Sequence, residues 1–129
     1  MNKKYDAIGK RIATQYNVRV AKWRNNATGC AWATYYPNGE VKRYIKSPHP
    51  TTPLRLAIFI HEIGHHAIGF DKYERGYEEE YHVWKWAEEQ LTINVVLPDE
   101  RITRRIRLSL EYELQKAKNR RTKLSSLQV

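Results

Sequence analysis

The order of apolar and polar positions in this 129-residue chain changes its period several times. In the first segment, Tyr5, Ile8, Ile12 and Tyr16 follow one another at three- and four-residue intervals, so one side of a helix would carry them all. Most residues between them are polar or charged. This spacing predicts an amphipathic helix over residues 3–16.

Residues 18–46 have the two-residue period of β-strands instead. Valine alternates with arginine at the start of this segment, and the stretch 30–36 is rich in aromatic and small residues. Turn-forming sequences at 25–29 and 37–39 divide the segment into parts. We therefore expect a small antiparallel sheet of about three strands.

Proline and glycine mark the bounds of a second helix. Thr52 followed by Pro53 is typical of an N-cap and a first helical residue, and Gly69 stands where a C-terminal glycine is expected. After a polar loop, Tyr77, Tyr81, Trp84 and Leu91 have helical spacing again, which predicts a third helix. The two helices together span residues 53–91.

The C-terminal third predicts two further elements. Residues 92–97 are β-branched and apolar, as in a short strand or an extended core segment. Apolar residues at four-residue intervals predict a last, basic helix and tail over residues 99–129. The whole chain is expected to form a single α+β domain, which is what its length also suggests.

The composition indicates in which cellular compartment the protein is expected. Cys30 is the only cysteine, so an intramolecular disulfide is excluded and a reducing compartment is expected. No apolar segment follows the basic start as in a signal peptide, and the longest apolar run, residues 56–60, is too short for a membrane span. We expect a cytoplasmic protein with no membrane partner.

The net charge of +9 is unevenly distributed. Residues 1–60 hold 11 Lys and Arg against 2 acids, residues 61–98 hold 3 against 8, and residues 99–129 hold 9 against 4. The acidic middle suits a bound cation, and the basic remainder suits an acidic partner such as nucleic acid.

The second predicted helix carries His61-Glu62-Ile63-Gly64-His65 within an otherwise apolar run. Such polar groups are costly to bury unless something pairs or coordinates them. Residues four apart share one helical face, so both imidazoles can reach one metal ion, and Glu62 beside them can take a proton from a water molecule. Zn²⁺ is the ion that this motif indicates. The alternative is a core helix whose histidines bond to backbone or carboxylate groups.

The third predicted helix offers further ligands. Catalytic zinc takes three protein ligands, and Glu80 and His82 are both candidates by spacing. Glu80 is favoured because it shares a helical face with Trp84, which we expect to point inward. The neighbouring Glu78 and Glu79 are expected in solvent.

The motif followed by Glu80-Tyr81-His82-Val83-Trp84-Lys85-Trp86-Ala87 resembles the gluzincin metallopeptidases, whose second helix carries E-x-x-A/S-D. The short chain is most similar to their ImmA/IrrE type, and the resemblance extends from about Tyr16 to Pro98. The resemblance implies a zincin-like fold, zinc held by three side chains and a general base beside them. It also implies an intracellular protein substrate, such as a repressor or regulator in a phage or mobile element. The implied ligands are His61, His65 and Glu80, and the implied base is Glu62.

The chain departs from this pattern at two positions. Val83 stands where a small residue is usual, and Trp84 stands where an aspartate often steadies a ligand histidine. Asp71 or a backbone carbonyl is the candidate substitute. The other residues have structural interpretations: His66 at the surface or behind the ligands, His49 in a loop, Tyr73, Tyr77 and Tyr81 in the core or at the rim, Trp86 in packing and Cys30 in a strand. The alternative for His49 and for one of the three tyrosines is to stabilise the oxyanion of a tetrahedral intermediate.

The last helix has two interpretations. Its apolar stripe can pack on the domain with the basic face in solvent, or Arg101, Arg104, Arg105, Arg107 and the basic end at 116–123 can contact phosphates. If the last helix contacts nucleic acid weakly, the alternative function is that of a DNA-associated protease of the SprT kind. Such proteases use a third histidine as ligand, and His82 would then take this place. A third possibility is a zincin-like adaptor that binds a partner without catalysis.

Overall fold

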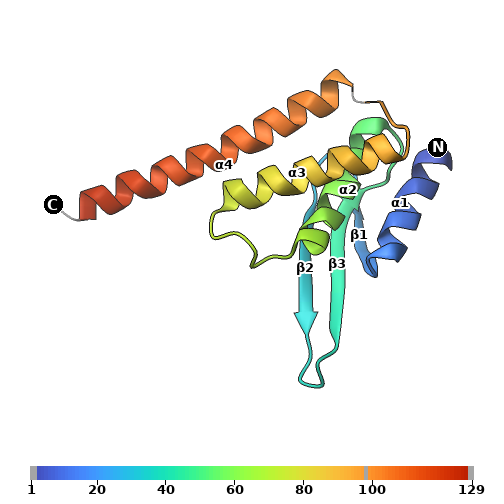
Figure 1. The fold of residues 1–129 in the computed structure, drawn as a ribbon, viewed down its shortest axis with the longest axis horizontal. Coiled ribbons are helices and arrows are strands. Elements are labelled where there is room, and N and C mark those ends of the chain that lie inside the picture. Colours follow the sequence, from blue (N-terminus) through green and yellow to red (C-terminus); the bar gives the residue numbers. More distant parts are fainter. Residues whose placement is uncertain (1–2, 98, 128–129) are drawn as a thin grey trace.

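The computed structural model of the protein describes residues 3–97 and 99–127. It contains four helices and three strands, so the predicted α+β class is confirmed (Figure 1). One hydrophobic core joins residues of α1, the sheet, α2, α3 and α4. The elements in chain order are α1 (Lys3–Gln15), β1 (Val18–Arg24), β2 (Cys30–Tyr35), β3 (Val41–Pro48), α2 (Pro53–Ile68), α3 (Gly76–Ile93) and α4 (Glu100–Leu127).

The sheet is mixed, and the prediction of an antiparallel sheet was wrong for one of its two pairings. The strand order is β1-β3-β2; β2 and β3 form the expected antiparallel hairpin, but β1 runs parallel to β3. The chain leaves β1 and crosses to the far edge before it returns through the centre. The alternation of apolar and polar residues is the same in both kinds of pairing, and therefore it could not reveal which strand lies in the middle.

Helices α1 and α2 pack on one face of the sheet, against core residues such as Ile45 of β3. The predicted ends of α2 are confirmed. The Thr52 hydroxyl accepts a hydrogen bond from the Arg55 backbone N–H at 3.1 Å, with Pro53 in the first turn, and Gly69 follows the helix with φ of 99°. Such a positive φ favours glycine because a side chain would crowd the backbone.

The segment after α3 is neither a strand nor an extended core segment, contrary to prediction. The helix continues to Ile93, and the chain then turns through Val95, which has φ of 59°. The Val96 N–H donates to the Leu91 carbonyl at 2.8 Å, which brings the Val96 side chain into the core. These β-branched residues therefore belong to a helix end, where local propensity yields to packing.

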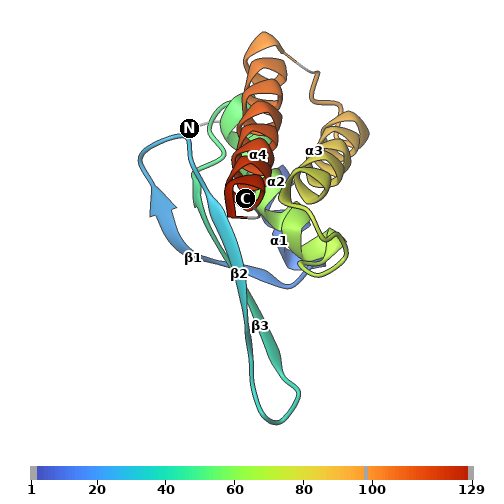
Figure 2. The same ribbon diagram turned by 90° about the vertical axis from the view of Figure 1, so that its left-hand side faces the viewer.

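Helix α4 starts at Glu100, and the carboxylate of Asp99 just before it accepts a hydrogen bond from the Ile102 N–H at 2.9 Å. It crosses above α3 and extends past the N-terminal end of α3, as Figures 1 and 2 show. Of the predicted apolar stripe, Ile102 is buried and Ile106 packs against the core, but Leu114 is 46% exposed, so the stripe packs on the domain only near its start. No helix among the described residues is long and apolar enough to cross a membrane.

Candidate metal centre

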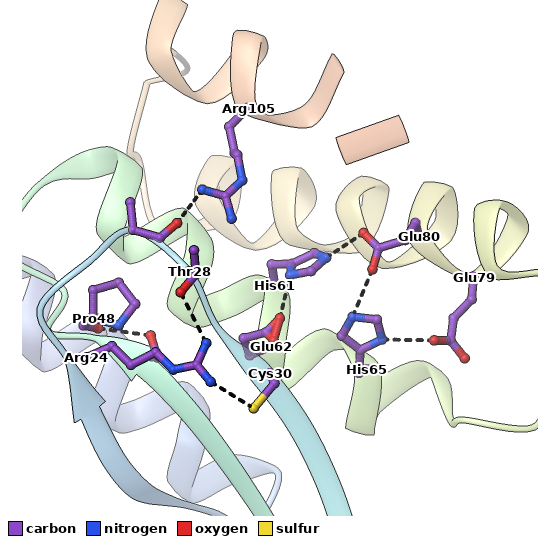
Figure 3. A network of polar contacts seen from close by, with 12 residues as sticks. Arg24, Thr28, Cys30, Pro48, His61, Glu62, His65, Glu79, Glu80 and Arg105 are labelled. Carbon is purple, nitrogen blue, oxygen red and sulfur yellow. Dashed lines mark hydrogen bonds and ion pairs between the residues drawn. The ribbon is translucent and has the colours of Figure 1, made fainter. Parts of the chain in front are cut away.

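Helices α2 and α3 bring two imidazoles and a carboxylate to one point (Figure 3). The Nε2 atom of His61 lies 2.9 Å from one oxygen of Glu80, and the Nε2 atom of His65 lies 3.2 Å from the other. One potential ligand atom from each of the three residues lies within 4.8 Å of the others, so the group could hold a metal ion.

The close approach of the two helices depends on Gly64, which lies between the two histidines. A Cβ atom at this position would lie 2.9 Å from Cγ1 of Val83 and 3.0 Å from the ring of Trp86. A Cβ contact under 3.0 Å is forbidden without movement of a neighbour. The missing side chain of Gly64 therefore makes room for Val83, the residue that departs from the gluzincin pattern.

Each imidazole has a carboxylate on both sides. The Nδ1 atom of His61 is 2.9 Å from Oε1 of Glu62, and the Nδ1 atom of His65 is 3.0 Å from Oε2 of Glu79. A carboxylate accepts hydrogen bonds and donates none, whereas a neutral imidazole has a single N–H. With Nδ1–H donated to Glu62 or Glu79, each Nε2 therefore turns a lone pair toward the Glu80 carboxylate. A proton or a cation must lie between them.

The shifted pKa values of His61 and Glu80 also show that the cluster stabilises positive charge. Burial works to lower the pKa of His61, but the hydrogen bonds with Glu62 and Glu80 outweigh it and raise the pKa to about 9. Burial likewise works to raise the pKa of Glu80, but the bonds to His61 and His65 hold it well below its ordinary value. Burial raises the pKa of Glu79 against the attraction of His65. In the absence of another cation, the cluster therefore keeps a proton on His61 while Glu80 stays ionised.

Aromatic packing holds the first imidazole. Trp84 is 2% exposed, and its ring lies 4.1 Å from the His61 ring, with 24° between their planes. The residue that replaces the aspartate of the gluzincin pattern therefore contacts the ligand candidate by stacking. The carboxylates of Glu62 and Glu79 provide the hydrogen bonds to Nδ1, and Asp71, the expected substitute, is exposed beside β2.

Only one of the two carboxylate oxygens of Glu62 has a hydrogen-bond partner among the described residues. Its Oε1 bonds to His61, whereas its Oε2 is buried and has no hydrogen-bond partner among the described residues. The loop that leads into β2 passes close by: a Cβ atom at Gly29 would lie 2.7 Å from Cγ of Glu62 and 2.8 Å from the Lys46 carbonyl oxygen. An unsatisfied buried carboxylate oxygen is costly, and it is a feature of sites that act on a bound molecule.

A cavity of about 380 Å³ opens over the cluster. Its floor includes His61, Glu62, His65 and Glu80, and one wall is formed by the start of β2. The opposite wall comes from one face of α4, with Arg105, Ser109, Tyr112 and Glu113. Arg105 also donates to the Ala27 carbonyl oxygen, which ties α4 to the loop before β2.

The rival ligand candidate lies elsewhere. The His82 ring stacks on Tyr73, with centroids 4.4 Å apart, and it is outside the three-residue cluster. His66, next to the second ligand candidate, bonds to the Tyr44 carbonyl oxygen at 2.9 Å, and burial lowers its pKa despite that bond. Both histidines therefore have structural contacts in place of a position at the centre.

The other residues considered from the sequence are also placed by their contacts. His49 stacks on Trp23 at 3.8 Å, Tyr77 accepts a hydrogen bond from Arg75 at 2.8 Å, and Tyr81 is 50% exposed. Cys30 is only half-buried; it accepts from Arg24 at 3.6 Å and lines the cavity. The tyrosine that lines the cavity is Tyr112 of α4, which the sequence did not single out.

Glu79 was placed wrongly by sequence reasoning. It was expected in solvent, but its side chain is only 19% exposed and bonds to His65. A helical wheel puts it beside the inward face, and only the angle between α2 and α3 decides whether it reaches an imidazole. The sequence contained one indication of the cavity wall that α4 forms: Arg105, Ser109, Tyr112 and Glu113 share one helical face.

Comparisons of the chain with protein-family models, with curated proteins and with solved structures found no match. The chemistry of the cluster therefore rests on its own residues and their geometry.

Proposed function

We propose that the protein is a zinc-dependent metallopeptidase that cleaves a protein substrate. The observation that carries this proposal is the meeting of two imidazole Nε2 atoms with both oxygens of Glu80, at 2.9 and 3.2 Å. Two histidines and one glutamate, with an open side toward a cavity, match the ligand set of a catalytic zinc site.

The charges of the cluster favour a dication. Glu62, Glu79 and Glu80 contribute three negative charges in a largely buried space, and the two imidazoles are neutral when they act as ligands. A Zn²⁺ ion among the Nε2 atoms and Glu80 would take the place of the proton that His61 otherwise holds there. The bonds of Glu62 and Glu79 to the Nδ1 atoms would hold both rings in the orientation and tautomer that a ligand needs.

Bound zinc supplies Lewis acidity, which polarises a peptide carbonyl and lowers the pKa of water to about 7. Glu62 is the general base: its unpartnered Oε2 can accept a proton from that water, while Oε1 stays bonded to His61. The same carboxyl group can then return the proton to the leaving amine. Arg105 and Tyr112 line the cavity and are available to contact the substrate.

An extended peptide is the substrate shape that suits the surroundings. In the described sheet, β2 pairs with β3 on one side, and its other edge is free for a further strand. Cys30 and Ala31 at the start of this strand line the cavity over the cluster. A peptide that adds to the β2 edge would therefore pass its backbone across the metal site.

The sequence resemblance to the ImmA/IrrE type extends the proposal to a zincin-like fold and a regulatory protein substrate inside the cell. The stacking of His82 on Tyr73 favours Glu80 as third ligand and gives no support to the histidine ligand of SprT-type proteases. A catalytically inactive adaptor remains the alternative that activity measurements must decide.

Metal analysis of the purified protein tests the site. We expect about one zinc per chain in the wild type and in His82→Ala, and loss of zinc in His61→Ala and Glu80→Gln. Equal zinc content in all four proteins would remove the cluster from metal binding. The zinc-loaded wild type should then cleave members of a quenched-fluorescent peptide library. Zinc binding without cleavage of any member would favour the adaptor.

A further inference from the structure

The face of the sheet turned away from α1 and α2 has its own composition. Core residues such as Val20, Ala31 and Ile45 point toward the helices, and successive strand residues point to opposite faces. The pairing of the strands therefore places a second set of side chains together on the other face. We call this set the open sheet face; its charged and aromatic members are Arg19, Lys22 and Arg24 of β1, Trp32 of β2, and Lys42, Tyr44 and Lys46 of β3.

Two aromatic rings lie side by side at the centre of the open sheet face. Trp32 and Tyr44 are directly paired across β2 and β3, with ring centroids 5.6 Å apart and 23° between their planes. Both side chains are partly exposed. The Lys46 ammonium lies 5.6 Å from the centre of the Trp32 ring. The two rings thus lie nearly parallel to each other, with a cation beside the Trp32 ring.

Five cations surround this pair on the same face, and no acidic residue is among them. Asp6 and Glu40 are the only acids in the first 60 residues, and Glu40 lies in the turn between β2 and β3. Lys22 and Lys46 are directly paired on neighbouring strands. This pairing adds to the concentration of positive charge on one face, which a bound polyanion would neutralise.

We propose that the open sheet face binds single-stranded nucleic acid. Unpaired bases would stack on Trp32 and Tyr44, and the cations of β1 and β3 would contact the phosphates. Sequence-tolerant stacking on aromatic side chains beside a basic track is how proteins bind single strands, because every base has a flat face and every nucleotide a phosphate. The Lys46 ammonium would move from the Trp32 ring to a phosphate when a base enters.

This surface differs from the one that the sequence suggested. On α4, Arg105 is half-buried and bonds to Ala27, while Arg104 and Arg107 are exposed on a helix without a stacking platform of paired rings. The open sheet face combines charge with stacking, and the combination favours a nucleic acid over an acidic protein. The proposal does not depend on the metal centre, whose three candidate ligands come from α2 and α3.

Fluorescence anisotropy of a labelled oligothymidylate, titrated with the full chain at two salt concentrations, tests the proposal. We expect binding that weakens steeply with salt and a lower affinity for a duplex of equal length. Trp32→Ala and Tyr44→Ala should each weaken binding by about 5- to 150-fold, the change that corresponds to one base stack of about 1–3 kcal/mol. Lys22→Gln with Lys46→Gln should reduce the log–log salt slope by about 0.7 for each phosphate that the protein no longer neutralises.

Matched variants separate stacking from loss of structure. Trp32→Phe keeps an aromatic surface and should keep most of the affinity, but it should lose the quenching of tryptophan emission that the oligonucleotide causes in the wild type. Tyr35→Ala removes a 70% exposed ring from the opposite side of β2 and should bind as the wild type does. Arg104→Gln with Arg107→Gln, on α4, should also leave the affinity unchanged.

Several results would overturn the proposal. One is the absence of any anisotropy change at low salt and micromolar protein, and another is wild-type affinity in both Trp32→Ala and Tyr44→Ala. Loss of binding in the α4 variant alone would move the contact to that helix. Competition by polyglutamate as effective as that by unlabelled oligonucleotide of equal charge would identify an acidic protein surface as the better partner.

Discussion

The carboxylate of Glu79 lies 3.0 Å from the Nδ1 atom of His65, on the side of the ring opposite to Glu80. A carboxylate in this place fixes the orientation of the imidazole and increases its basicity as a ligand. We expect Glu79→Gln to lower the zinc affinity about 10- to 100-fold, as measured by competition with a chelating dye. The adjacent Glu78→Gln is the control and should bind zinc as the wild type does. Equal affinities in all three proteins would limit Glu79 to a packing role.

Glu62 combines a bond to His61 with a free oxygen, and its replacement should separate metal binding from catalysis. In Glu62→Gln, the amide oxygen still accepts from the His61 Nδ1–H, but the side chain cannot take a proton from water. We expect full zinc content and a fall of about 100- to 10,000-fold in kcat on a peptide that the wild type cleaves. Unchanged kcat at unchanged zinc content would assign the proton transfer to another group.

The metal-free protein should lose stability as the pH rises above neutrality. The pKa of His61 is raised from 6.5 to about 9 in the folded protein, so its contribution to stability is complete below pH 6.5 and is lost as the pH rises through about 9. The pKa of Glu80 is lowered, so its contribution is present above its ordinary 4.5 and is lost only in more acidic solution. Urea unfolding of chelator-treated protein should therefore show a midpoint that falls between pH 6.5 and 9.

Two comparisons check the origin of that pH dependence. His61→Gln should flatten the decline, because the titrating group is absent. Saturating zinc should also remove it, since a metal ion displaces the His61 proton and the affinity for the ion rises with pH. A metal-free wild type that becomes more stable between pH 6.5 and 9 would contradict the assignment of the raised pKa to His61.

The features that the sequence predicted well are local ones. Thr52 and Pro53 determine the start of α2 and Gly69 its end, each through contacts within the nearest helical turn. The spacing of His61 and His65 follows from helical geometry alone. What could not be predicted depends on how distant segments meet. Strand alternation does not encode that β3 lies between β1 and β2, and the course of α4 over the cluster follows from the burial of Ile102 in a core built by the other elements.

The end of α3 shows a second limit of sequence reasoning. Val95 has a β-branched side chain at φ of 59°, a conformation that costs about 1–3 kcal/mol for such residues. Its local preference is for extended backbone, and the sequence accordingly predicted a short strand or an extended core segment. The burial of Val96 and the bond from its N–H to Leu91 outweigh that preference and impose the turn.

Relief of this strain should stabilise the protein. Val95 is 73% exposed, so Val95→Gly removes little packing, and we expect the free energy of unfolding to rise by about 1 kcal/mol. Ile93→Gly is the control: it is 70% exposed but helical, and it should lower the free energy of unfolding by about 1 kcal/mol. Chemical denaturation of the three proteins gives the comparison. Destabilisation by both substitutions would show that Val95 is not strained.

Gly29, in the loop before β2, lies so close to Glu62 that a methyl group at this position should impair catalysis without removing the metal. In Gly29→Ala, the new Cβ would lie 2.7 Å from Cγ of Glu62 and 2.8 Å from the backbone oxygen of Lys46, which cannot move freely. The Glu62 side chain and the backbone before β2 must therefore shift, whereas the hydrogen bonds of His65 and Glu80 do not involve Glu62. We expect wild-type zinc content and a loss of about 100-fold in kcat, since a misplacement near 1 Å has an effect of this order. Gly39→Asn is the control, because Gly39 has open space around it and asparagine tolerates its φ of 88°. If Gly29→Ala loses zinc together with activity, the strand supports the whole metal centre and not the base alone.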